Sequence, residues 1–262
     1  AAVHELSHRT AFKSKRVNGF FYKLFCFLTW NNPYHFKESH NRHLQYTYFH
    51  EFDREQISRP IPFTKVDIVS WFTFDYKKFF RYVKMNLSYS IGTMKSDLFF
   101  WNQLVENEDP KARKMINWAR FLLIGHIGLL TLFVLLEAWV LIYMVSFAYF
   151  FLTFLSHSTG ISQHTGLRGD VADWRMNSFT IDMNPILRFL YWNMNYHTEH
   201  HMYAGVPFYN LPKLRRILVS DLQKPMPGLL STIRCIIDTN KKQKQDPEYR
   251  YEPEFPPTAD EG

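Results

Sequence analysis

The sequence predicts an all-α integral membrane protein, in which a transmembrane helical hairpin carries a cytosolic helical cap with clustered histidines. One continuous apolar run occupies residues 117–156, whereas the remaining apolar stretches are short, aromatic and interrupted by charge. Histidines three or four residues apart recur on both sides of that run.

The run at residues 117–156 is about twice the roughly 20 helical residues that cross a bilayer core. We therefore expect two helices joined by a tight turn near Glu137, where a carboxylate reaches water. Basic residues flank the run and none lies at the turn, so the positive-inside rule predicts that residues 1–116 and 157–262 both face the cytosol. The flanking basic residues are Arg113, Lys114, Arg120, Arg168 and Arg175.

Two aromatic segments precede the hairpin. Residues 17–30 are apolar but too short to span comfortably, and they end at Asn31, Asn32 and Pro33. This pattern is typical of a helix lying in the membrane interface, and a buried core helix fits it nearly as well. Residues 66–83 mix aromatic with basic side chains and receive the same interpretation.

After the hairpin, Asn184 and Pro185 break the chain before an aromatic segment. Residues 211–222 read as an amphipathic helix that Pro225 and Pro227 follow. Residues 239–262 are charged and proline-rich with little apolar content, which predicts a disordered tail.

The amino-acid composition favours some classes of binding partner over others. The net charge of +7 favours an acidic partner or an anionic membrane surface over nucleic acid, because the aromatic residues fall in apolar runs and not among clustered Lys and Arg. Two distant cysteines do not make a disulfide framework. The chain begins without Met, three residues before His4, so we expect a further amino-terminal segment in the whole protein.

Eight of the twelve histidines fall in four short clusters. The first, HELSH, fits both the zinc peptidase pattern H-E-x-x-H and the di-iron pattern H-x-x-x-H. Histidines three or four apart on a helix lie about 5–6 Å from each other on one face, close enough to share an ion. A zinc peptidase needs three protein ligands and would leave five of these histidines without a purpose. The eight are His4, His8, His40, His43, His164, His197, His200 and His201.

With HELSHRT, NNPYHFKESHNRHLQYT, SQHTGL and NYHTEHHMYAGVPFYNLPKL in sequence, the chain resembles the membrane-bound fatty acid desaturases and the related membrane hydroxylases. The resemblance covers residues 1–238 and implies that the eight histidines hold two iron ions, with Glu5 orienting an imidazole. It also implies O2-dependent insertion of a double bond into a fatty acyl chain. The partners it implies are a lipid substrate, the membrane and an electron donor such as cytochrome b5 or ferredoxin.

Two departures from the family keep alternatives open. The second histidine box has Leu44 where a further histidine is usual, and leucine binds no metal. Water, His50, His35 or His157 could replace it, and we favour His157, which precedes His164 by two helical turns. The amino-terminal membrane hairpin of the family is missing here. The rival interpretations are a hydroxylase on the same scaffold, an altered or mononuclear centre, an inactive homologue and, less favoured, a zinc peptidase.

Four other polar or aromatic residues have open roles. His126 lies in the apolar run, where we expect a hydrogen bond that packs helices together rather than a metal ligand. Trp192, Asn193 and Asn195 precede the third histidine cluster. They could shape the site or the substrate channel, and core packing is an equal alternative for the tryptophan.

Overall fold

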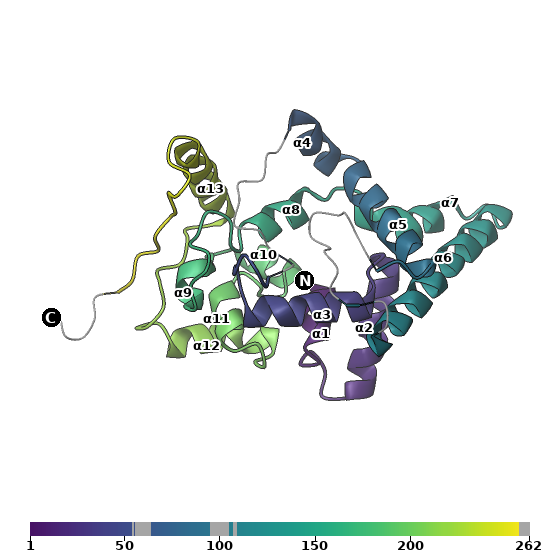
Figure 1. Cartoon of the computed structure of the whole chain (residues 1–262), viewed down its shortest axis with the longest axis horizontal. Coiled ribbons are helices and arrows are strands. Elements are labelled where there is room, and N and C mark those ends of the chain that lie inside the picture. Colours follow the sequence, from purple (N-terminus) through teal and green to yellow (C-terminus); the bar gives the residue numbers. More distant parts are fainter. Residues whose placement is uncertain (54, 56–63, 95–104, 107–108, 257–262) are drawn as a thin grey trace. The chain divides into compact units, whose positions relative to one another are not determined.

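The computed structural model describes residues 1–53, 55, 64–94, 105–106 and 109–256, and these residues are helical with no strand (Figure 1). The chain divides into two compact units. The first comprises residues 1–15, 42–62 and 156–262, and the second comprises residues 16–41 and 63–155. The boundary falls inside α3, Pro33–Gln45, which is one uninterrupted helix.

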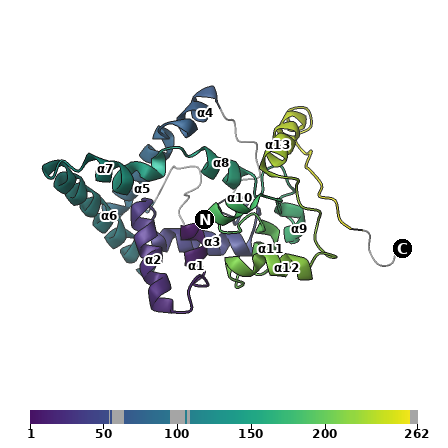
Figure 2. The same ribbon diagram turned by 180° about the vertical axis from the view of Figure 1, so that it is seen from behind.

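The second unit contains most of the apolar helical surface. Helix α5 packs along α6, as Figures 1 and 2 both show, and the buried core between them includes Met85, Tyr89, Met115 and Ala119. Besides most of α3, its elements are α2 (Lys15–Leu28), α4 (Lys65–Phe72), α5 (Tyr76–Ser90), α6 (Pro110–Leu135), α7 (Trp139–Leu141), the π-helix η1 (Ile142–Phe147) and the 3₁₀ helix η2 (Ala148–Phe150).

The first unit is built from shorter helices. They are α1 (Ala2–Ser7), α8 (Phe154–Ile161), α9 (Trp174–Asn177), α10 (Pro185–Leu190), α11 (His197–Met202), the 3₁₀ helix η3 (Phe208–Asn210), α12 (Leu211–Ile217) and α13 (Leu229–Gln243). Asn184 caps α10 by accepting a hydrogen bond from the Leu187 amide, as the Asn-Pro pair predicts. Helix α12 ends at Ile217, five residues before the predicted end.

Helix α6 is the candidate membrane span. Its 26 residues extend about 39 Å, enough to cross a bilayer core, and apolar side chains such as Ile124 and Leu135 are exposed along it. It begins seven residues before the predicted start, because Asp109 caps its first amides and Pro110 occupies its first turn.

The returning arm of the predicted hairpin is shorter than expected. The chain turns at Glu137, as predicted, with φ of 53°. The apolar segment that follows, Trp139–Phe150, has twelve residues divided among α, π and 3₁₀ turns. Among the described residues α6 is the one helix long enough to cross a bilayer, so the second crossing and the cytosolic orientation stay predictions.

His126 packs helices together as expected. Its ring stacks between Phe27 and Trp30, each with a ring-centroid separation of 4.4 Å. The Nε2 atom donates to the Phe27 carbonyl and Nδ1 accepts from the Ser146 hydroxyl, both over 3.1 Å. Both ring nitrogens therefore have partners inside the apolar unit.

The segment predicted as one helix at residues 66–83 is broken. Helix α4 ends at Phe72 and α5 starts at Tyr76, because the Asp75 carboxylate caps α5 by accepting from the Lys78 amide over 3.0 Å. The same carboxylate accepts from the Thr153 hydroxyl over 3.1 Å, and the Asp75 amide donates to the Phe150 carbonyl. Asp75 thus ties the start of α5 to the end of the apolar arm.

The described part of the predicted disordered tail has defined packing. Helix α13 continues to Gln243, and the Tyr251 amide donates to the Gly166 carbonyl over 2.8 Å. The Tyr251 ring packs beside Leu167 and Phe179. A few aromatic anchors therefore outweigh the low overall hydrophobicity of residues 239–256, and the rest of the tail lies outside the described residues.

Replacing Asp75 by Ala should lower the free energy of unfolding by about 1–2 kcal/mol, because a capping acceptor and the link to Thr153 are both lost. Thermal unfolding in detergent measures the change. Asp75→Asn is the control, since it keeps one acceptor oxygen. An Ala variant as stable as the wild type would contradict the role of this cap.

Candidate metal centre

The short helix α11 lies at the centre of the first unit. Its residues His197, His200 and His201 are all buried. At 100° per residue, these three rings fan over about one third of the helix circumference. The helix can therefore present its imidazoles to two neighbouring points on one side of its axis.

One group of four imidazoles lies entirely in the first unit. His43 from α3, His164 from the turn after α8, and His197 and His201 from α11 each offer a ring nitrogen within 4.8 Å of the others. The His197 Nε2 is 2.9 Å from the His164 Nε2 and 3.0 Å from the His201 Nε2. Two imidazole nitrogens this close need a proton or a cation between their lone pairs, so the donor set fits one metal ion.

The outward nitrogens of these rings are held by the protein. The His164 Nδ1 donates to the Asn177 carbonyl over 2.7 Å. The Thr47 hydroxyl donates its hydrogen to the His43 carbonyl, so it accepts a hydrogen bond from the His201 Nδ1 over 2.9 Å. These bonds fix the tautomers that leave Nε2 with a free lone pair, the form that binds metals.

Burial keeps two of the rings neutral. Burial lowers the pKa of His164 to about 3, and the pKa of His201 is also well below its usual value, from burial first and then from repulsion by neighbouring imidazoles. An imidazole with such a pKa is unprotonated near pH 7. It can donate its lone pair without first losing a proton.

His43 has a carboxylate behind it. Its Nδ1 lies 2.8 Å from an oxygen of Asp53, and both side chains are buried. Burial opposes both charges, but their mutual attraction raises the pKa of His43. The same attraction, with amide hydrogen bonds from Tyr48 and Glu55, lowers the pKa of Asp53 to about 2. A carboxylate in this position raises the basicity of an imidazole ligand.

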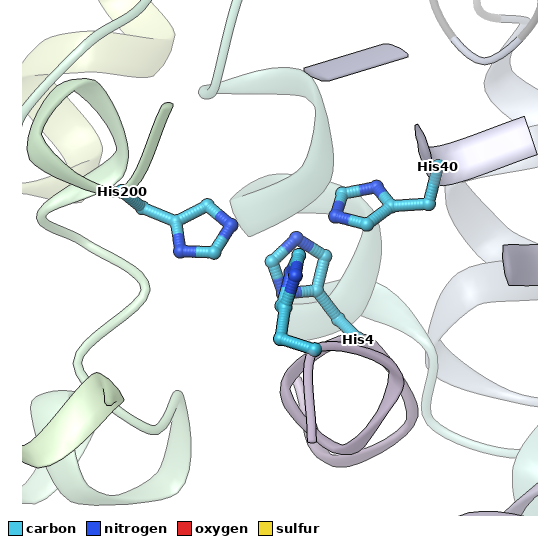
Figure 3. Close-up of side chains that lie close together, drawn as sticks. His4, His40 and His200 are labelled. Atoms are coloured by element: carbon cyan, nitrogen blue, oxygen red, sulfur yellow. The ribbon is translucent and has the colours of Figure 1, made fainter. Parts of the chain in front are cut away.

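A second group gathers around α1. The ring centroids of His4, His8 and His200 are 4.7–5.2 Å apart, and one nitrogen of each lies within 4.8 Å of the others. Figure 3 shows the ring of His200 directed toward His4. The His4 Nδ1 lies 2.8 Å from Glu5, whose carboxylate is also 4.0 Å from the His200 Nδ1. Glu5 therefore orients an imidazole, as the sequence predicts.

The same glutamate does not fit the zinc peptidase interpretation of HELSH. Glu5 is fully buried, and burial raises its pKa to about 8. A peptidase base must face a metal-bound water. Glu5 instead holds the ring of His4.

Four further histidines lie at positions 35, 40, 50 and 157. His40 is buried and lies three residues before His43 on α3, one turn away on the same helix. His35 accepts a hydrogen bond from Tyr89 over 2.6 Å, and His50 is exposed. His157 lies on α8 and belongs to neither histidine group found among the described residues, and its predicted compensation for Leu44 stays a prediction.

Residues next to the third histidine cluster act mainly in packing. The Trp192 ring lies 4.7 Å from that of Phe208, and Trp192 and Asn193 both have positive φ in the turn before α11. The Asn195 amide group donates to the Ile181 carbonyl over 2.8 Å. The predicted role of these residues in a substrate channel stays a prediction.

Sequence reasoning missed Asp53, Thr47 and Asn177. Asp53 and Thr47 follow His43 within ten residues, so their nearness in sequence was the available signal. Asn177 contributes its backbone carbonyl, a group that every residue carries, so its identity in the sequence gave no signal of this role.

The helical fold and the two imidazole groups define a helical protein with a candidate metal centre and a candidate membrane span. Residues 1–228 match the family model described as Fatty acid desaturase, so the chain belongs to the fatty acid desaturase family. Searches of curated proteins and of solved structures gave no match. Membership implies an oxidoreductase associated with membranes and with lipid substrates.

Replacing His164 by Gln should flatten the acid side of the stability profile of the metal-free protein. The folded-state pKa of about 3 lies below the unfolded value near 6.5. This histidine thus contributes stability that is complete above pH 6.5 and declines as pH falls toward 3. Denaturant unfolding in detergent with chelator at pH 7, 6 and 5 should show a slope up to about 1.4 kcal/mol per pH unit smaller in the variant. Equal slopes would contradict the burial of a neutral His164.

Replacing Asp53 by Asn should weaken metal binding about 10- to 100-fold at the group that contains His43, because the anion behind that imidazole is lost. Metal titration of the chelated protein measures the effect. Glu51→Gln, which changes a nearby exposed carboxylate, is the matched control. Unchanged affinity in Asp53→Asn would refute this role.

Proposed function

We propose that the protein is an O2-dependent di-iron oxidoreductase that introduces a double bond into a fatty acyl chain or a similar apolar lipid. The observation that carries the proposal is the presence of two imidazole groups in a chain of this family. Imidazole suits iron, and an all-imidazole donor set leaves the charge of the ions uncompensated. When bound, such ions supply activation of dioxygen and removal of hydrogen from an unactivated C–H bond.

The proposed ligand assignment follows the two groups. His43, His164, His197 and His201 would hold one iron, and His4, His8 and His200 the other. His40, from the second histidine cluster of the sequence, is the proposed fourth donor to the second iron. Leu44 contributes no donor, and the assignment leaves out His157.

The chain's own residues prepare this centre. Asn177 and Thr47 fix the His164 and His201 tautomers, and Asp53 supports His43. Burial of His164 and His201 excludes bulk water, so that these two imidazoles are neutral before any ion is bound.

Desaturation consumes two external electrons per double bond, so we propose a separate electron carrier such as cytochrome b5 or ferredoxin as donor. An acidic carrier would suit the net charge of +7. We also propose that α6 anchors the chain in the membrane and that residues 1–116 and 157–262 face the cytosol. The basic residues on both sides of the apolar run support this orientation.

Iron content and product mass test the function together. The wild-type protein should bind two irons per chain and, with an electron donor and O2, remove two hydrogen atoms from a supplied acyl lipid. His201→Ala and His200→Ala should each lower the iron content and abolish turnover, whereas His157→Ala is the matched control that keeps both.

The product distinguishes the rival reaction. Addition of one oxygen atom to the lipid would mean a hydroxylase on the same scaffold. Full iron content in both alanine variants would sink the ligand assignment, and an iron-free wild type with no turnover would sink the proposed function.

A further inference from the structure

The side of α11 opposite its histidines carries two buried polar residues. Thr198 and Glu199 lie between His197 and His200 and are completely buried. At 100° per residue they point away from the arc that the three imidazoles occupy. They cannot bind the metals that those imidazoles would hold, so their burial needs another explanation.

Glu199 is held from α12. The Arg215 Nη1 donates to one Glu199 oxygen over 3.2 Å, and the Thr180 hydroxyl donates to the other. The Arg215 side chain is only 12% exposed, so this ion pair is largely shielded from water. Removing one partner of such a pair leaves an uncompensated buried charge, which is strongly unfavourable.

Thr198 is held from the segment after α12. The Gln223 amide donates to the Thr198 hydroxyl over 2.7 Å and to the Ser178 carbonyl over 2.9 Å. The second guanidinium nitrogen of Arg215 donates to the Gln223 carbonyl over 2.6 Å. Arg215 therefore touches Glu199 directly and reaches Thr198 through Gln223.

Helix α11 needs such support. It has six residues and no side-chain cap at its start. An isolated helix of that length is unstable in water, because so few hydrogen bonds do not offset the unfavourable free energy of helix nucleation. Its orientation must come from tertiary contacts. On its far side these include the contacts of Arg215, Thr180 and Gln223, and the Thr198 hydroxyl also donates to the Ser178 carbonyl over 3.0 Å.

We infer that Arg215 is a positioning residue for the metal centre, which sets the orientation of α11 and through it the imidazoles of both histidine groups. This inference rests on the proposed function, because it concerns the same two metal positions. It makes a distinctive claim: Asp53 supports one group through His43, whereas Arg215 supports both, since α11 supplies His200 to one and His197 and His201 to the other.

The test is a titration of the purified, chelated full-length protein with Co²⁺ alone, followed through its visible absorption bands. The wild type should bind two Co²⁺ ions. Arg215→Met should weaken both binding steps about 10-fold or more and alter the spectrum of both bound ions. Asp53→Asn should weaken one step only. Arg216→Met, which removes an exposed arginine from the same helix, should match the wild type.

Two further variants keep the test decisive. If Arg215→Met does not fold, Arg215→Lys takes its place, and we expect intermediate weakening of both steps, because an ammonium group cannot form both guanidinium contacts. The double variant Arg215→Met, Glu199→Gln should lose less Co²⁺ binding free energy than the sum of the losses in the two single variants, since the two side chains contact each other.

The outcomes separate the two claims. Two binding steps of wild-type affinity in Arg215→Met, or weakening confined to one step, would overturn the positioning role and leave the di-metal proposal standing. A wild-type protein that binds no Co²⁺ or iron would overturn the proposed function, and the inference with it.

Discussion

The structure depends on burying neutral imidazoles whose inner nitrogens face each other. Three Nε2 atoms, from His164, His197 and His201, approach to about 3 Å in a dry interior. Without an ion this arrangement brings lone pairs together and needs outside support, which the contacts of Thr47 and Asn177 supply. The polar contacts around these rings are therefore as necessary to the folded unit as its apolar core.

The sequence was most informative where function imposes spacing. The pairs His4 with His8 and His197 with His201, each four residues apart, fall within one group as helical spacing predicts, and the motifs predicted the family. The turn at Glu137 was also predicted, because a single carboxylate interrupts a long apolar run. In each case the residue type and its position in the sequence are compatible with few structural roles.

The sequence was least informative where a tertiary contact decides. Asp75 divides a continuous aromatic segment because its carboxylate accepts a hydrogen bond from Thr153, which is distant in the sequence. The apolar arm after Glu137 adopts π and 3₁₀ turns, which an apolar sequence pattern does not distinguish from an α-helix. Helix α8 ends at Ile161, before His164, so the helical spacing assumed between His157 and His164 does not extend to the second residue.

The hydrogen bond from the Tyr251 amide to the Gly166 carbonyl joins a residue inside the family match to a residue beyond it. Gly166, two residues after His164, lies within the region shared with the family, whereas Tyr251 lies beyond residue 228, where that match ends. The Thr239 side chain also faces the space in which a side chain at Gly166 would lie. The end of the family match at residue 228 therefore does not coincide with the end of the compact unit, because residues beyond it pack against the turn that follows His164.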